Sequence, residues 1–153
     1  MEGDGDAPYG RDRRLKTHLD PVFTPETRPY WEGVAQGELR LCTCCSCDRC
    51  FFPPSNVCPG CSSREIDWRI ASGRATLYSF VINPQADERW GIEGPMSVAM
   101  VKLEEGPMML STVVHCPQTI EALRFDMNLR LVFRPYGDLP RVACFEPVGQ
   151  ADE

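Results

Sequence analysis

The amino-acid sequence predicts a mainly β protein with a short N-terminal helix, a small metal-bound ribbon and a C-terminal five-stranded barrel. Three observations lead to this class. Seven of the nine cysteines fall within residues 41–61, glycine and proline contribute 12 and 14 residues, and short apolar runs recur after residue 74. Clustered thiols of this kind suit a metal site, while abundant turn-forming residues favour short strands over long helices.

We expect five segments along the 153 residues. They are a mobile tail (1–18), a helical segment (19–37), the ribbon (38–71), the barrel domain (72–148) and a second tail (149–153). The first tail is rich in glycine and charge and has almost no apolar content to bury. It lacks an apolar signal segment, and no apolar run reaches the roughly 18 residues that span a membrane. We therefore expect a soluble, cytoplasmic protein with no membrane partner.

The segment 23–37 carries the signals of a short helix. Thr24 or Thr27 can cap its start, Pro25 suits the first turn, and Gly37 is placed to end it in a left-handed conformation. One face of this helix gathers three large apolar side chains: Tyr30, Trp31 and Val34. Such a helix must bury its aromatic side chains on its own ribbon or on another protein, and we favour another protein.

Alternating polar and apolar residues predict a strand over 38–42, leading into the cysteine cluster, and another over 66–70, leaving it. A unit of about 35 residues buries too little surface to fold without its metal ion. Four thiolates around one divalent cation leave a net negative charge. Three basic residues are near enough in sequence to offset this charge: Arg40, Arg49 and Arg64.

The metal ligands are predicted from the spacing of the cysteines. Two residues between paired thiols allow a tight turn, or knuckle, to aim both sulfurs at one ion, about 2.3 Å from Zn²⁺. One knuckle is Cys58/Cys61, and three overlapping pairs lie upstream: Cys42/Cys45, Cys44/Cys47 and Cys47/Cys50. Cys44/Cys47 leaves ten residues for a hairpin between the knuckles, whereas Cys47/Cys50 leaves only seven, which is tight for a hairpin containing two prolines.

We therefore predict a structural Zn²⁺ held by four ligands: Cys44, Cys47, Cys58 and Cys61. A disulfide cluster is the alternative, but paired thiols in a chain without a signal segment are more often metal ligands. A thioredoxin-like redox site is disfavoured because no βαβ pattern surrounds either knuckle. Three cysteines exceed the four ligands, and we interpret them as ordinary free thiols, with a second metal site or a redox switch as the alternatives: Cys42, Cys45 and Cys50.

The rest of the chain is dominated by strand signals. Strands are predicted over 75–82, 96–103, 108–114, 129–133 and 142–145, with one helical turn over 119–123 and a loop over 83–95 that encloses Trp90. Five short strands with a small helical insertion suit a partly open Greek-key barrel of the OB type. An SH3-like barrel or a small sandwich fits the composition nearly as well.

Charge and reactive residues limit the function classes. Residues 75–153 carry eleven acids and six bases, whereas nucleic-acid binding requires a basic groove with aromatic side chains. His115 and Cys116 are adjacent, and neighbours on a strand point to opposite faces, so we expect a surface histidine and a buried thiol rather than a catalytic pair. Cys144 lies within a predicted strand and receives the same interpretation. We predict no catalytic residue in this chain.

Six sequence runs carry a family resemblance. They are GELRLCTCCSC (37–47), FPP (52–54), CPGC (58–61), SGRATLYS (72–79), VAMVKLEEG (98–106) and LVF (131–133). Together they resemble the zinc-ribbon and OB-fold accessory proteins of thiolase-superfamily enzymes, over about residues 22–147. The resemblance implies a helix, a rubredoxin-like ribbon and a C-terminal OB fold, with the first knuckle at Cys44/Cys47. The chain departs from the family pattern at Asp48, where a glycine is usual, and at Ser55, where a basic residue is usual.

The resemblance also implies a noncatalytic zinc subunit of a heteromeric enzyme. The partner would be a thiolase, a hydroxymethylglutaryl-CoA-synthase-like enzyme, a steroid-side-chain aldolase or a polyketide acyltransferase, with coenzyme A thioesters as substrates of the complex. We expect the chain to bridge subunits and shape the substrate channel, with an interface formed by Trp31, Phe52, Pro53 and Pro54. The alternatives are a single-stranded nucleic-acid-binding module, by fold analogy alone, and an unaided hydrolase of CoA esters.

Overall fold

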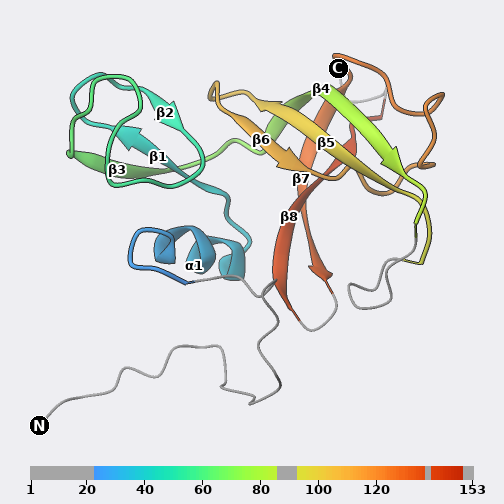
Figure 1. The fold of residues 1–153 in the computed structure, drawn as a ribbon, viewed down its shortest axis with the longest axis horizontal. Helices are drawn as coiled ribbons and strands as arrows, with labels where there is room; N and C mark the ends of the chain where they lie inside the picture. Colours follow the sequence, from blue (N-terminus) through green and yellow to red (C-terminus); the bar gives the residue numbers. More distant parts are fainter. Residues whose placement is uncertain (1–22, 86–92, 137–138, 150–153) are drawn as a thin grey trace, which may run out of the picture.

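A computed structural model describes residues 23–85, 93–136 and 139–149 (Figure 1). The predicted tail at 1–18 and Trp90 lie outside this part. The described residues form one helix and two antiparallel sheets, which confirms the mainly β prediction. In chain order the elements are α1 (Arg28–Gln36), β1 (Arg40–Cys44), β2 (Cys50–Phe51), β3 (Ile66–Ile70), β4 (Arg74–Asn83), β5 (Met96–Leu103), β6 (Met108–Ser111), β7 (Asn128–Tyr136) and β8 (Leu139–Pro147).

Helix α1 ends at the predicted Gly37 and begins after Thr27, one of the two predicted caps, although the Thr27 side chain makes no capping hydrogen bond and Pro25 lies before the helix. Thr27 is its N-cap, and Gly37 ends it at φ 79°, a left-handed conformation that glycine adopts without steric cost. The N–H groups of Gly37 and Glu38 donate to the carbonyls of Val34 and Gly33, at 3.2 and 2.8 Å, and so satisfy the end of the helix. No helix in the described part of the chain is long and apolar enough to cross a bilayer.

The apolar face of α1 is largely buried within the chain itself. Tyr30 and Val34 are 9% and 0% exposed, and the helix contacts both β1 and β8. The expectation that this face is buried by another protein is therefore wrong for these two residues. Trp31 is only half-buried, and its ring packs edge-on against Phe23 at 5.3 Å and Tyr30 at 5.0 Å. Part of the aromatic face thus remains accessible.

The ribbon is a three-stranded antiparallel sheet in the order β2-β1-β3. Its central strand pairs Cys42 with Phe51 on one side and with Trp68 on the other. The strand predicted over 66–70 has the expected bounds, whereas the one predicted over 38–42 lies two residues later, as β1. The reason is the register with β3, which carries the pairing on to Cys44 and so into the first knuckle.

The five C-terminal strands form a curled antiparallel sheet in the order β6-β5-β4-β7-β8. Its two end strands approach each other where Val113 forms a parallel bridge with Phe145. The Ser111 hydroxyl also donates to the Ala143 carbonyl at 2.9 Å. The result is a half-barrel, as expected for a partly open OB-type barrel, and not two stacked sheets.

One predicted barrel strand is shorter in the structure. The strand predicted over 108–114 ends at Ser111, because Val113 turns away from β5 to bridge β8. The buried hydroxyl of Ser97 accepts the N–H of Val113 at 2.9 Å and donates to its carbonyl at 3.1 Å. The predicted helical turn over 119–123 is present as a single turn, in which the Leu123 N–H donates to the Thr119 carbonyl at 3.3 Å.

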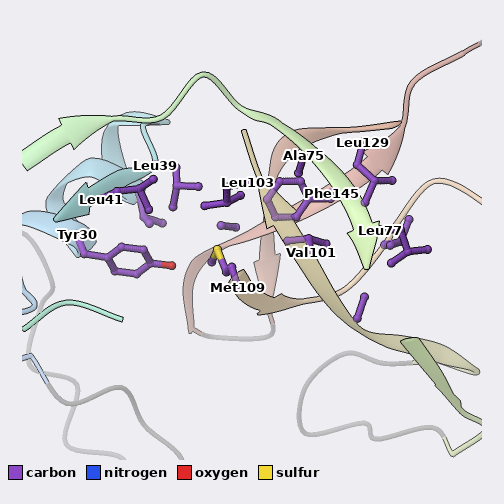
Figure 2. Packing of buried hydrophobic residues seen from close by; sticks show 14 of the residues in the cluster. Tyr30, Leu39, Leu41, Ala75, Leu77, Val101, Leu103, Met109, Leu129 and Phe145 are labelled. Atoms are coloured by element: carbon purple, nitrogen blue, oxygen red, sulfur yellow. The ribbon is translucent and has the colours of Figure 1, made fainter. Parts of the chain in front are cut away.

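One apolar core joins the helix, the inner end of the ribbon and the barrel (Figure 2). Its labelled side chains are Tyr30, Leu39, Leu41, Ala75, Leu77, Val101, Leu103, Met109, Leu129 and Phe145. Burial of each large member contributes about 1.5–3 kcal/mol, so this cluster stabilises the barrel and fixes α1 against it. The outer part of the ribbon has a much smaller cluster, made of Cys42, Cys44, Phe51 and Cys58.

Candidate metal centre

The two knuckles have the same backbone structure. In the first, the N–H of Cys44 donates to the carbonyl of Arg49, and the N–H of Asp48 donates to the carbonyl of Cys44, both at 2.9 Å. The second knuckle repeats these bonds from Cys58, at 2.9 and 3.0 Å. Each turn thus closes on itself and directs both of its sulfurs toward the other knuckle.

The residue after each second cysteine has a left-handed backbone. Asp48 has φ 57° and Ser62 has φ 62°. Glycine is the residue that adopts this region most readily, and aspartate tolerates it better than most other residues. Asp48 therefore adopts the backbone conformation that this position of the knuckle requires, as Ser62 does in the second knuckle.

The sulfur atoms of Cys44, Cys47, Cys58 and Cys61 all lie within 4.8 Å of one another. The Cys44 and Cys61 sulfurs are 3.5 Å apart, and the Cys47 and Cys58 sulfurs are 3.7 Å apart. A tetrahedral site with Zn–S bonds of about 2.3 Å has sulfurs separated by about 3.8 Å. These four thiols therefore fit a structural Zn²⁺, and they are the four that the spacing predicted.

Hydrogen bonds from the backbone favour thiolates at this site. The N–H groups of Cys61 and Gly60 lower the pKa of the Cys58 thiol to about 6, against the effect of burial. The N–H of Arg49 has the same effect on Cys47, but burial and the neighbouring thiols raise the pKa of Cys47 to about 12. Such opposite shifts arise because four close thiols cannot all ionise without a cation. A divalent ion would remove this conflict.

The three surplus cysteines lie outside the sulfur cluster. Burial raises the pKa of Cys42, which is 1% exposed, and also that of the half-buried Cys50. Cys45 is exposed and lies next to the ligand Cys44. Cys42 and Cys50 therefore stay protonated at neutral pH.

An apolar groove of about 440 Å³ lies where the helix, the ribbon and the barrel meet. Tyr30 and Trp31 of α1 line it together with Phe52, which follows β2, and the Tyr30 and Phe52 rings are 5.5 Å apart. The barrel contributes residues of β5, β6 and β8, among them Cys144. Burial raises the pKa of Tyr30 to about 12 and that of Cys144 to about 11, so both groups stay neutral.

Two of the four predicted interface residues, Trp31 and Phe52, line this groove. Pro53 is exposed and Pro54 is half-buried, and both directly follow Phe52 in the chain. The barrel residues that line the groove were not predicted from the sequence. Strand alternation shows that Cys144 and Phe145 face opposite sides of β8, but it does not show that α1 covers the side of Cys144.

A second hollow, of about 350 Å³, lies at the junction of ribbon and barrel. Two arginines line it, but each is paired with an acid. Arg74 binds Glu104 through two bonds of 2.9 and 2.7 Å, and Arg130 Nε donates to Glu146 at 2.6 Å. These cations are therefore already neutralised by their partners.

The residues considered for reactivity do not form a pair. His115 is exposed, has φ 57° and directs Nδ1 at the Glu146 carboxylate. Cys116 is half-buried beside Gln118, whose Nε2 lies 3.6 Å from its sulfur, and burial raises the pKa of this thiol. His115 therefore does not activate Cys116 in this structure.

Two family models match adjacent parts of the chain. Residues 31–67 match the rubredoxin-like zinc ribbon domain of ChsH2, and residues 68–134 match the C-terminal OB-fold domain of ChsH2. The junction between the matched regions falls within β3. These matches identify the two folds that the structure shows.

Several curated proteins are similar in sequence. A DUF35 domain-containing scaffold protein of Methanothermobacter thermautotrophicus is 36% identical over 113 residues, covering 71% of this chain and 82% of the relative. A DUF35 domain-containing scaffold protein of Pyrococcus furiosus is 26% identical over 105 residues, covering 69% of this chain and 76% of the relative. The 3-oxo-4,17-pregnadiene-20-carboxyl-CoA hydratase alpha subunit of Mycobacterium tuberculosis is 33% identical over 109 residues, covering 67% of this chain but 34% of the relative.

Solved structures share the fold. A chain of the Ltp2-ChsH2(DUF35) aldolase superposes with a TM-score of 0.73 at 24% identity, covering 83% of this chain and 98% of the other. A DUF35-family protein of unknown function from Sulfolobus solfataricus superposes with a TM-score of 0.58 at 16% identity, covering 81% and 86%. The sulfur cluster, the half-barrel and these relatives together show that the chain belongs to the DUF35/ChsH2 family of zinc-ribbon and OB-fold proteins.

Proposed function

We propose that this chain is a noncatalytic, zinc-binding subunit of a heteromeric thiolase-type enzyme acting on acyl-CoA or related acyl substrates. The observation that carries the proposal is the apolar groove between α1, the ribbon and the barrel. An apolar groove lined by partly accessible aromatic side chains, as at Trp31 and Phe52, is typical of a protein interface. The relatives described as scaffold proteins, a hydratase alpha subunit and an aldolase chain support a role within an enzyme complex.

The contribution of the chain to the complex is structural. Zn²⁺ held by the four thiols fixes the hairpin that carries Phe52, and Trp31 lies beside it on α1. Buried aromatic residues at interface centres commonly contribute about 2 kcal/mol or more each, and Pro53 and Pro54 add rigid apolar surface. The barrel then closes one wall of the substrate channel and excludes water, while the partner supplies the chemistry. Because such thiolates require a reducing environment, we place the complex in the cytoplasm.

Co-expression with thiolase-fold proteins tests this proposal. The full chain is produced together with candidate thiolases and hydroxymethylglutaryl-CoA-synthase-like enzymes, and the products are separated by size-exclusion chromatography with metal analysis. We expect one partner to co-elute with the zinc-loaded chain. Trp31→Ala and Phe52→Ala should abolish co-elution without changing the zinc content. Phe125→Ala is the matched control, since Phe125 is 66% exposed but does not line the groove.

Other outcomes would contradict the proposal. If the zinc-loaded chain elutes as a monomer and binds none of the thiolase-fold candidates, the proposed scaffold role is wrong. Tight binding to single-stranded DNA with a steep dependence on salt would support the nucleic-acid module instead. Turnover of a CoA ester by the purified chain alone would support the hydrolase.

A further inference from the structure

Each knuckle reaches across to the other through the residue two positions after its second ligand. In the first knuckle this residue is Arg49, and in the second it is Ser63. The hydroxyl of Ser63 lies 2.9 Å from that of Ser46, while the side chain of Arg49 lies over Gly60. Ser46 and Gly60 occupy equivalent positions, each directly before a second ligand. These two contacts therefore connect the knuckles. One is between the hydroxyls of Ser63 and Ser46, and the other is between the Arg49 cation and Gly60.

Gly60 provides the space for the arginine. A Cβ atom at this position would lie 2.6 Å from Arg49 Nε and 3.0 Å from Arg49 Cζ, which is closer than real side chains approach. Gly60 is not among the described glycines with positive φ, so its backbone would accept another residue, but a side chain here would displace the end of the flexible Arg49 side chain. Its N–H donates to Cys58 Sγ at 3.3 Å. The guanidinium thus lies against the residue that bonds to a ligand sulfur.

The charge of Arg49 is available to the metal centre. Within the described residues no carboxylate forms an ion pair with it, and its own N–H bonds to the Cys47 sulfur. Of the other arginines suggested by the sequence, Arg40 is paired with Glu38 at 2.8 Å. The side chain of Arg64 forms no hydrogen bond or ion pair in the part of the chain that the structure describes. Arg49 is therefore the arginine whose placement fits charge compensation.

We propose that Arg49 is a positioning residue of the metal centre. Its guanidinium, seated over Gly60, compensates the negative charge of the tetrathiolate and holds the second knuckle in its ligand geometry. This inference rests on the assignment of the four cysteines to Zn²⁺ and is independent of the partner enzyme. Mutation of groups that contact metal ligands without binding the metal commonly lowers metal affinity by about 10–100-fold. Because Arg49 is exposed, its electrostatic effect should be screened by salt.

Competition for Zn²⁺ between the full chain and a chromophoric chelator tests the proposal at low and high salt. At low salt, Arg49→Gln should weaken Zn²⁺ binding about tenfold, and the loss should shrink at high salt. Arg49→Lys, which keeps the charge, should restore most of the affinity. Arg64→Gln is the matched control and should behave as wild type. The absorption bands of bound Co²⁺ report whether each variant keeps a tetrahedral thiolate site.

A double-mutant cycle tests the contact with Gly60. Gly60→Ala should weaken Zn²⁺ binding by displacing the guanidinium, and it should cost little more once Arg49→Gln is present. Ser63→Ala removes the neutral contact with Ser46, so any loss that it causes should not depend on salt. A failure of the wild-type chain to bind Zn²⁺ would overturn the metal assignment itself. Wild-type affinity in Arg49→Gln, an equal loss at both salt concentrations, failure of lysine to rescue, or additive losses in the cycle would each overturn the role of Arg49.

Discussion

The ribbon and the barrel are both small antiparallel β structures, but they are stabilised in different ways. The barrel encloses most of the main core, which includes Leu77, Val101, Leu129 and Phe145, each at most 1% exposed. The outer ribbon buries only four apolar residues, and two of them, Cys44 and Cys58, belong to the sulfur cluster. We therefore expect the ribbon to depend on a metal ion for a stability that the barrel obtains from apolar burial.

Removal of the metal should produce the largest difference in stability between the ribbon and the barrel. Structural Zn²⁺ in small domains contributes about 10–16 kcal/mol of apparent binding free energy, which the ribbon cannot replace. We expect a chelator, or Cys58→Ser, to abolish hydrogen-exchange protection in β1 and β3, while β5 and β7 remain protected. Cys45→Ser is the matched control, since Cys45 is next to a ligand but outside the cluster. Persistent protection of β1 after the loss of metal would refute the comparison.

A core substitution should have the converse effect. Phe145 is fully buried, so Phe145→Ala should lower the free energy of unfolding of the barrel by about 3–5 kcal/mol. Below the new urea midpoint the zinc content should stay unchanged, because the ligands lie in the ribbon. Phe125→Ala, at a position 66% exposed, should change the free energy of unfolding by only about 0.5 kcal/mol. Equal losses in the two variants would show that the barrel core is not the main source of stability.

The two regions also differ in how far the sequence predicted them. The four cysteines that the spacing favoured as ligands lie together in the structure, because two residues between cysteines permit few geometries and the hairpin needed room for Pro53 and Pro54. Strands β3 and β5 were also predicted with correct bounds, from alternation, and helix α1 with the correct end at Gly37. Local chemistry determines these elements, which is why local patterns predict them.

Features that depend on distant parts of the chain were not predicted. Strand β6 ends early because Val113 bridges Phe145, thirty-two positions away in sequence. The alternation of polar and apolar residues does not indicate this contact. The burial of Tyr30 on β8 and the apolar groove have the same origin. The contact between Arg49 and Gly60 depends on how the two knuckles lie relative to each other, which the spacing of the cysteines does not specify.

A pH-dependent contribution to the barrel is expected at Glu146, which binds His115 and Arg130. The hydrogen bond from His115, followed by that from Arg130, lowers the pKa of Glu146 from its ordinary 4.5. A lowered pKa in the folded state stabilises the fold above pH 4.5, and this stabilisation is lost as the pH falls through the lower folded value. Glu146→Gln should therefore reduce the free energy of unfolding by about 1 kcal/mol at pH 7 and by less in acid.

Urea unfolding over a series of pH values measures this difference. Glu121→Gln serves as the control, because Glu121 is exposed and forms no ion pair among the described residues. A difference between wild type and Glu146→Gln that stays constant down to acidic pH would assign the effect to packing rather than to charge.

The smallest expected effect concerns the backbone of the second knuckle. Ser62 has φ 62°, a conformation in which a Cβ atom is strained, and its hydroxyl forms no hydrogen bond within the described residues. Ser62→Gly should therefore stabilise the metal-loaded ribbon by about 0.5–1 kcal/mol, measured as a higher urea midpoint for the release of Zn²⁺. Ser62→Ala removes the same hydroxyl but keeps the Cβ atom, so it should give no gain. A gain in both variants would place the strain elsewhere, whereas a gain in glycine alone would show that the ribbon tolerates backbone strain because its ligands hold the turn.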